Sequence, residues 1–132
     1  QRLFPDYRKV ETEYYQKTKV FPIMHVIAIK KAILEKNPWV AANLMNAFEE
    51  ARQLSIGRVL EITASRMPLP WLTFEAEEKI KLLGNDYFPY GIEDNRTTLE
   101  AFLKWTYEQG IAKKRLKPED LFPAVVHGKF RI

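Results

Sequence analysis

Apolar side chains recur at three- and four-residue intervals along most of the chain, and Pro or Gly separates the periodic stretches. This interval places the apolar positions on one face of a helix. The pattern predicts four or five helices, within the periodic blocks at residues 5–17, 30–36, 37–63, 73–84, 95–110 and 117–122. The block at 30–36 predicts only a short helical turn, and that at 117–122 a last one.

The longest predicted helix begins at Asn37-Pro38, where an Asn cap precedes Pro at the first helical position. Its apolar stripe follows a period of about 3.6 residues. We expect this helix to be part of the core, on a stripe of Val40, Leu44, Ala47, Phe48, Ala51 and Leu54.

One segment has a different pattern. Residues 22–29 read Pro-Ile-Met-His-Val-Ile-Ala-Ile and are apolar on both faces apart from His25. A short run of this kind predicts a strand buried on both sides, at about residues 22–30. A single strand cannot form a sheet, so its partners would come from sequence outside this chain, from another chain, or from a weak strand elsewhere in this one. The predicted class is therefore α/β but mostly helical.

Composition narrows the class of protein. With 132 residues, 46% of them hydrophobic, the chain is long enough for one globular domain and excludes a disordered chain. No apolar run is long enough to span a membrane. The absence of cysteine excludes disulfides and thiolate metal sites, and His25 and His127 lie too far apart in the sequence for metal-ligand spacing. We expect neither a metal nor another cofactor.

The net charge of +4 arises in residues 113–132, a basic tail. Such a tail can bind nucleic acid or an acidic partner, but a solvated chain end is the commoner explanation. Because no aromatic residues are interleaved with the basic ones for base stacking, we expect no nucleic-acid partner.

His25 and Arg66 are the first candidates for chemistry. An imidazole titrates near neutral pH and can serve as a general acid or base, whereas a lone buried histidine is more often simply hydrogen-bonded. Arg66 precedes Pro68-Leu-Pro-Trp71, and a rigid extended segment can hold a guanidinium against a carboxylate. The alternative for Arg66 is a solvated arginine at a helix end.

Aromatic residues and a helix start supply the remaining candidates. Trp71, Tyr87, Phe88 and Tyr90 lie in two predicted loops, where they form either the lining of a ligand cleft or a small satellite core. Asn95-Arg96 at a predicted helix start could bind an anion, although plain helix capping is the alternative.

Short motifs occur in an order that resembles the C-terminal part of the 4,5-dihydroxyphthalate decarboxylase family, over about residues 2–122. They include Phe21-Pro-Ile-Met-His25, Asn37-Pro-Trp-Val40, Ala47-Phe-Glu-Glu-Ala51, Pro68-Leu-Pro-Trp-Leu72, Gly84-Asn-Asp86, Phe88-Pro-Tyr-Gly91 and Asn95-Arg96. The resemblance implies the type II periplasmic-binding fold, which has two α/β lobes around a cleft. Residues 1–132 would then be a single C-terminal domain or fragment of a longer two-lobe parent.

The resemblance also implies a chemistry, the non-oxidative loss of CO₂ from an aromatic dicarboxylate. On the motif positions, His25 would be the general acid, Arg66 the carboxylate clamp, and Trp71 and Tyr90 the walls, with Arg96 as a further substrate contact. The alternative is a solute-binding protein of an ABC transporter, for a small anionic aromatic or pyrimidine-like ligand. The enzyme is expected in the cytoplasm and the binding protein in the periplasm. With half a sheet uncovered, we also expect this chain to dimerise or associate further.

Overall fold

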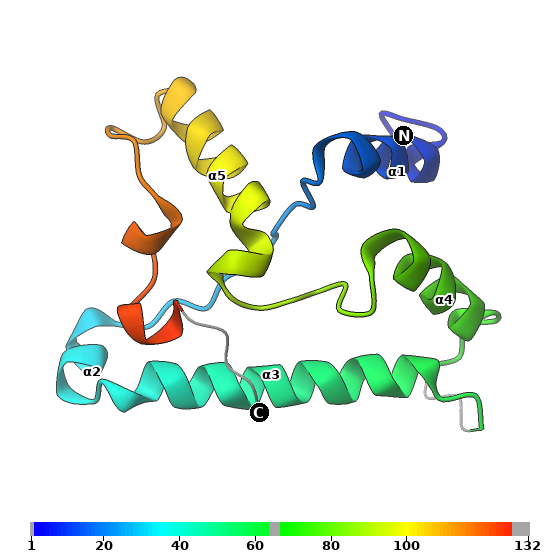
Figure 1. Ribbon diagram of the computed structural model, residues 1–132, viewed down its shortest axis with the longest axis horizontal. Helices are drawn as coiled ribbons and strands as arrows, with labels where there is room; N and C mark the ends of the chain where they lie inside the picture. The colour runs from blue at the N-terminus through cyan, green and yellow to red at the C-terminus, as the bar shows by residue number, and fades with distance from the viewer. Residues whose placement is uncertain (1, 64–66, 128–132) are drawn as a thin grey trace. The chain divides into compact units, whose positions relative to one another are not determined.

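The computed structural model describes residues 2–63 and 67–127. In this part of the chain every regular element is helical (Figure 1). The elements are α1 (Tyr7–Thr18), α2 (Lys31–Lys36), α3 (Trp39–Leu60), α4 (Leu72–Leu83), α5 (Ile92–Glu108) and the short 3₁₀ helices η1 (Pro118–Asp120) and η2 (Ala124–Val126). The prediction of a mostly helical chain is therefore confirmed. None of the described helices combines the length and apolar character needed to cross a bilayer.

The chain divides into two compact units. Of the described residues, the first unit comprises 2–28 and 91–127, and the second comprises 29–63 and 67–90. Helices α1 and α5 with η1 and η2 belong to the first unit, whereas α2, α3 and α4 belong to the second.

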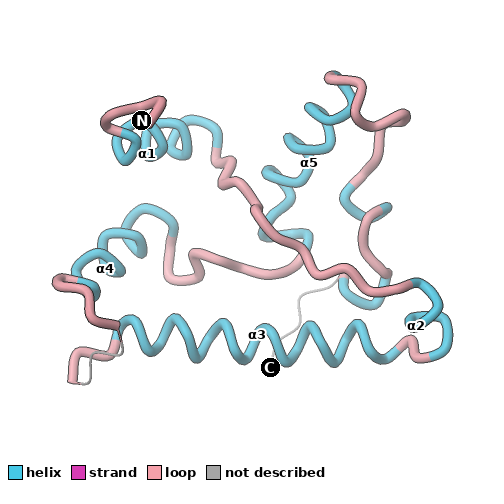
Figure 2. The backbone as a smooth tube through the Cα atoms, turned by 180° about the vertical axis from the view of Figure 1, so that it is seen from behind, coloured by secondary structure: helices cyan, strands magenta, loops and turns pink. Residues whose placement is uncertain are grey.

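The predicted strand at 22–30 is wrong: this segment has no regular secondary structure, and Figure 2 draws it as loop. Most of its side chains, His25 included, are exposed. A strand is stabilised by hydrogen bonds to a neighbouring strand, and the described residues contain no second strand to provide them. The α/β class is thus not found in the described residues.

The first unit is organised around α5. Its inner face buries Ile92, Leu99 and Leu103, which are spaced at helical intervals. Thr98 is also buried, and its hydroxyl accepts a hydrogen bond from the backbone N–H of Phe21 at 3.1 Å. This bond ties the segment after α1 to α5.

The second unit packs α4 against α3. Ala76 on α4 and Ala41 in the first turn of α3 are the buried residues of these two helices. The expected core stripe of α3 is largely wrong, because Phe48 and Leu54 are exposed. Within this unit α3 contacts α4 and α2.

Two helix starts differ from expectation. Helix α4 begins at Leu72 rather than after Thr73, and α5 begins at Ile92, ahead of the predicted start at Asn95 or Thr97. The predicted end of α4 is confirmed: Gly84 has φ +91° and donates its N–H to the Ile80 carbonyl at 2.8 Å.

Candidate functional site

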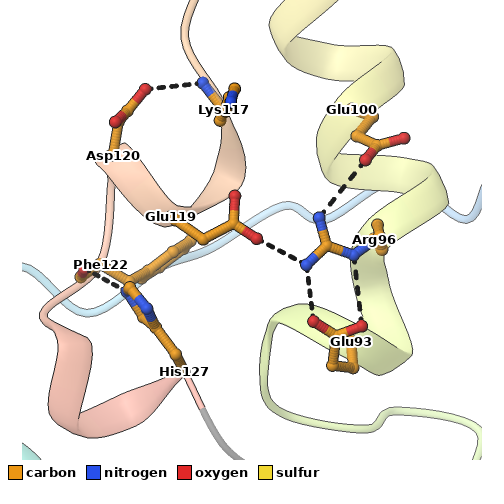
Figure 3. A network of polar contacts seen from close by, with 8 residues as sticks. All are labelled: Glu93, Arg96, Glu100, Lys117, Glu119, Asp120, Phe122 and His127. Carbon is orange, nitrogen blue, oxygen red and sulfur yellow. Dashed lines mark hydrogen bonds and ion pairs between the residues drawn. The ribbon is translucent and has the colours of Figure 1, made fainter.

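In the first unit a single guanidinium gathers three carboxylates (Figure 3). Arg96 projects from α5 between Glu93 and Glu100, one helical turn before and after it. Its Nε and Nη2 donate to the two oxygens of Glu93 at 3.3 and 2.6 Å, and Nη1 donates to Glu100 at 3.4 Å. Nη2 also donates to Glu119 of η1 at 2.6 Å. The cluster therefore fastens η1 to α5.

The electrostatics of this cluster oppose binding of an anion. Hydrogen bonds to Glu93 and then to Glu119 raise the pKa of Arg96, and the guanidinium lowers the pKa of Glu119. Three carboxylates surround one cation, so the local charge is negative. An incoming carboxylate would have to displace a partner that already holds the guanidinium.

The segment around η1 and η2 is closed by two further contacts drawn in Figure 3. The Lys117 backbone N–H donates to Asp120 at 2.8 Å, and the Nε2 atom of His127 lies 2.7 Å from the Phe122 carbonyl oxygen. His127 thus has a structural role at the end of the described chain.

The second unit has its own network, centred on Arg52 of α3. The Arg52 guanidinium binds Glu49 through Nε, at 2.9 Å, and through Nη2, while Nη1 binds Asp86. Gln53 adds a hydrogen bond to Glu49 at 2.9 Å. The guanidinium carbon also lies 5.5 Å from the centre of the Tyr90 ring, which is a cation–π distance. The Arg52 side chain therefore joins α3 to the segment after α4.

The aromatic segment that Arg52 contacts is the loop singled out in the sequence. Tyr87 and Phe88 pack edge to face, with ring centres 5.2 Å apart. Tyr90 is 42% exposed. Trp71, which precedes α4 in the same unit, is 81% exposed and has a left-handed backbone with φ +58°. Exposed aromatic rings therefore precede and follow α4 in the sequence, and they are available to a ligand or a partner.

The predicted site residues are divided between the two units. His25 and Arg96 belong to the first unit, and Trp71 and Tyr90 to the second. Arg66 lies outside the described residues. Arg96 lies one turn inside α5 and not at the start of the helix, where the sequence placed it. The roles assigned to these five side chains remain predictions.

Sequence reasoning missed Arg52, Glu49 and Asp86. The spacing of Glu49 and Arg52 on a predicted helix indicates a pair on one face, and that signal was available. The link to Asp86, 34 residues later, depends on how α4 returns along α3 and has no signature in the sequence. In the described ranges, no group of three His, Asp or Glu side chains is arranged to hold a metal ion.

Comparison with known proteins gives one informative similarity. The chain is 31% identical over 130 residues to 4,5-dihydroxyphthalate decarboxylase of Comamonas testosteroni. The match covers 98% of this chain and 39% of the relative, so the chain spans about two fifths of the relative's length. No family model matches the chain. The resemblance predicted from the ordered motifs is thereby confirmed: nearly the whole chain is similar to part of this decarboxylase.

Proposed function

We propose, from this similarity to a 4,5-dihydroxyphthalate decarboxylase, that the chain is part of an enzyme that removes CO₂ from an aromatic dihydroxy dicarboxylate. The similarity over 98% of the chain is the single observation that carries the proposal. Because the chain spans 39% of the relative, we propose the activity for the intact protein, with this chain as its C-terminal part in a type II periplasmic-binding-like fold.

The reaction needs an electron source, a proton and a leaving group. A ring hydroxyl para to one carboxylate donates electron density to the ring carbon that is bonded to that carboxylate. A general acid protonates this carbon, the bond to the carboxylate breaks, and its electron pair restores the aromatic ring as CO₂ leaves. One proton is gained and one CO₂ is lost, so no oxidant or reductant is required.

His25 is the proposed general acid. Its imidazole is the side-chain type suited to proton transfer near neutral pH. It is exposed on the irregular segment between α1 and α2, where a substrate can reach it. The sequence placed His25 within a buried strand, whereas the structure places it on an exposed, irregular segment.

The proposed substrate contacts are aromatic and cationic. Trp71 and Tyr90 would form the walls for the ring, as their exposure allows. Arg66 is proposed as the clamp for the carboxylate that stays on the ring. Arg96 is the weaker candidate for such a contact, since Glu93, Glu100 and Glu119 already occupy it.

A solute-binding protein is the second candidate function. The exposed rings of Trp71 and Tyr90 favour it, because the second unit presents aromatic walls without a histidine. Such a protein would hold a small anionic aromatic or pyrimidine-like solute and would need no acid. It would belong in the periplasm with an ABC transporter, whereas the enzyme would belong in the cytoplasm.

Turnover separates the two functions. The intact protein is incubated with 4,5-dihydroxyphthalate while CO₂ release and formation of the dihydroxybenzoate are followed. We expect turnover, and we expect His25→Gln to lower kcat about 100-fold or more with substrate affinity within about twofold of the wild type. His127→Gln, which removes the other histidine, should retain wild-type turnover.

Two outcomes contradict parts of this proposal. Binding without turnover by the wild type would favour the solute-binding function. Full activity of His25→Gln, with a wild-type KM, would exclude His25 as the acid.

We also propose that the isolated chain self-associates. Phe48 and Leu54 on α3 and Phe102 and Trp105 on α5 are large apolar side chains left exposed. Covering such surface is favourable at about 25 cal/mol per Å² of apolar area. Light scattering should show dimers or larger species, and a monodisperse monomer would refute this proposal.

A further inference from the structure

In the second unit, the Arg52 guanidinium makes three hydrogen bonds and one cation–π contact. The side chain projects from the middle of α3 and is only 9% exposed. Its planar fork matches the Glu49 carboxylate with two hydrogen bonds, from Nε and Nη2. The remaining nitrogen, Nη1, is left for a group outside the helix, and that group is Asp86.

The contacts with Asp86 and Tyr90 lie on a segment far from Arg52 in the sequence. Asp86 follows α4 by three residues, and Tyr90 is four residues further on. The guanidinium therefore contacts this segment at two points. It forms a charged hydrogen bond with Asp86 and a cation–π contact with the Tyr90 ring, whose centre lies 5.5 Å away. Residues 85–90 are not helical, and these two side-chain contacts connect the segment to α3.

The charges around Arg52 favour a role in which it binds other side chains of the protein and does not contact a ligand. Hydrogen bonding to Glu49 raises the pKa of Arg52, and the same bond lowers the pKa of Glu49. Two carboxylates face one cation, which leaves no excess positive charge for an anionic substrate.

We propose that Arg52 and Asp86 are positioning residues that hold Tyr90 in place to stack against the ring of an aromatic dicarboxylate. The inference rests on the proposed function, in which Tyr90 is a wall of the site. The Arg52–Asp86 pair keeps Tyr90 beside α3 while 42% of the Tyr90 surface stays open to a ligand. Neither positioning residue touches the substrate.

A double-mutant cycle tests whether Asp86 acts through Tyr90. Asp86 is chosen because its side chain is 56% exposed, so Asp86→Ala should leave the fold intact. In the intact protein we expect Asp86→Ala and Tyr90→Leu each to raise KM for 4,5-dihydroxyphthalate, and Kd for phthalate, about threefold to tenfold. kcat should stay within about twofold. The double variant should be no weaker than Tyr90→Leu alone, because both changes remove one interaction.

Two further variants make the assignment specific. Tyr90→Phe keeps the ring and should bind like the wild type. Glu35→Gln removes a carboxylate of the same unit whose ion pair with Lys31, at 3.7 Å, stays within α2, and it should leave Kd unchanged. Additive losses in the Asp86→Ala, Tyr90→Leu double variant, or a loss in kcat alone, would overturn the proposal.

A second readout does not depend on any ligand. This chain has no cysteine, so Asn85→Cys introduces one labelling site into it, beside Asp86, for a nitroxide spin label. We expect Asp86→Ala to increase the nanosecond mobility of this label, and Glu35→Gln to leave it unchanged. Equal mobility with and without the Asp86 carboxylate would overturn the anchoring. If the wild type neither binds nor converts either compound, the proposed function and the ligand role of Tyr90 both fail, while the label still decides the anchoring.

Discussion

Two neighbouring carboxylates on α3, Glu49 and Glu50, show how the surroundings of a residue determine its contribution to stability. Glu49 is 12% exposed, receives two hydrogen bonds from Arg52, and has a lowered pKa for that reason. Glu50 is exposed to solvent. A hydrogen bond to a charged group contributes more to stability than one between neutral groups, and it contributes most where water is excluded.

We therefore expect Glu49→Gln to lower the free energy of unfolding by about 1–3 kcal/mol, since the Arg52 fork loses its charged partner. Glu50→Gln should change it by less than about 0.5 kcal/mol. Urea denaturation followed by circular dichroism measures both variants. Equal effects of the two changes would mean that the Arg52–Glu49 pair adds nothing to stability.

The end of α1 illustrates what a helix requires of its last residues. Lys19 follows the final turn with φ +57° and donates its N–H to the Tyr15 carbonyl at 2.8 Å. This left-handed conformation costs a residue with a side chain about 1–2 kcal/mol, and glycine adopts it freely. Lys17, two residues earlier, lies inside the helix, where glycine is unfavourable.

The same substitution at these two positions should act in opposite directions. We expect Lys19→Gly to raise the free energy of unfolding by about 0.5 kcal/mol, because relief of the strain outweighs loss of the contact between Lys19 and the Tyr15 ring. Lys17→Gly should lower it by about 1 kcal/mol. Thermal denaturation followed by circular dichroism gives both values, and a loss of stability in both variants would show that the left-handed cap carries no strain.

At the scale of the whole molecule, two carboxylates couple stability to pH. The pKa of Glu49 and that of Glu119 both lie below the ordinary value of 4.5, each because of a guanidinium partner. Near this pH the folded chain thus binds fewer protons at these groups than the unfolded chain does. Their stabilisation is complete above about pH 4.5 and is lost as the pH falls through the lowered values.

We accordingly expect the free energy of unfolding to decrease as the pH is lowered from about 5 to 3. The double variant Glu49→Gln, Glu119→Gln should show a shallower decrease, with Glu49 contributing more because Glu119 is better solvated. Urea titrations at a series of pH values measure this slope. A slope equal to that of the wild type would exclude both ion pairs as its source.

Much of the helical pattern was determined by the sequence alone. Periodicity with Pro and Gly punctuation located the five α-helices of the described residues, and Gly84 ends α4 as expected. These features are local, since they depend on side chains within about one turn of each other. The ordered motifs also identified the similarity to 4,5-dihydroxyphthalate decarboxylase that comparison confirmed.

Only the tertiary structure decided which apolar segments pair with a strand and which charged residues contact one another. The run at residues 22–29 has strand composition but no described strand to pair with, so it stays irregular. Arg52 finds Asp86, and Arg96 finds Glu119, across 34 and 23 residues. Such pairs depend on which way a helix returns along its neighbour. That choice is made by packing over the whole unit, and no local pattern encodes it.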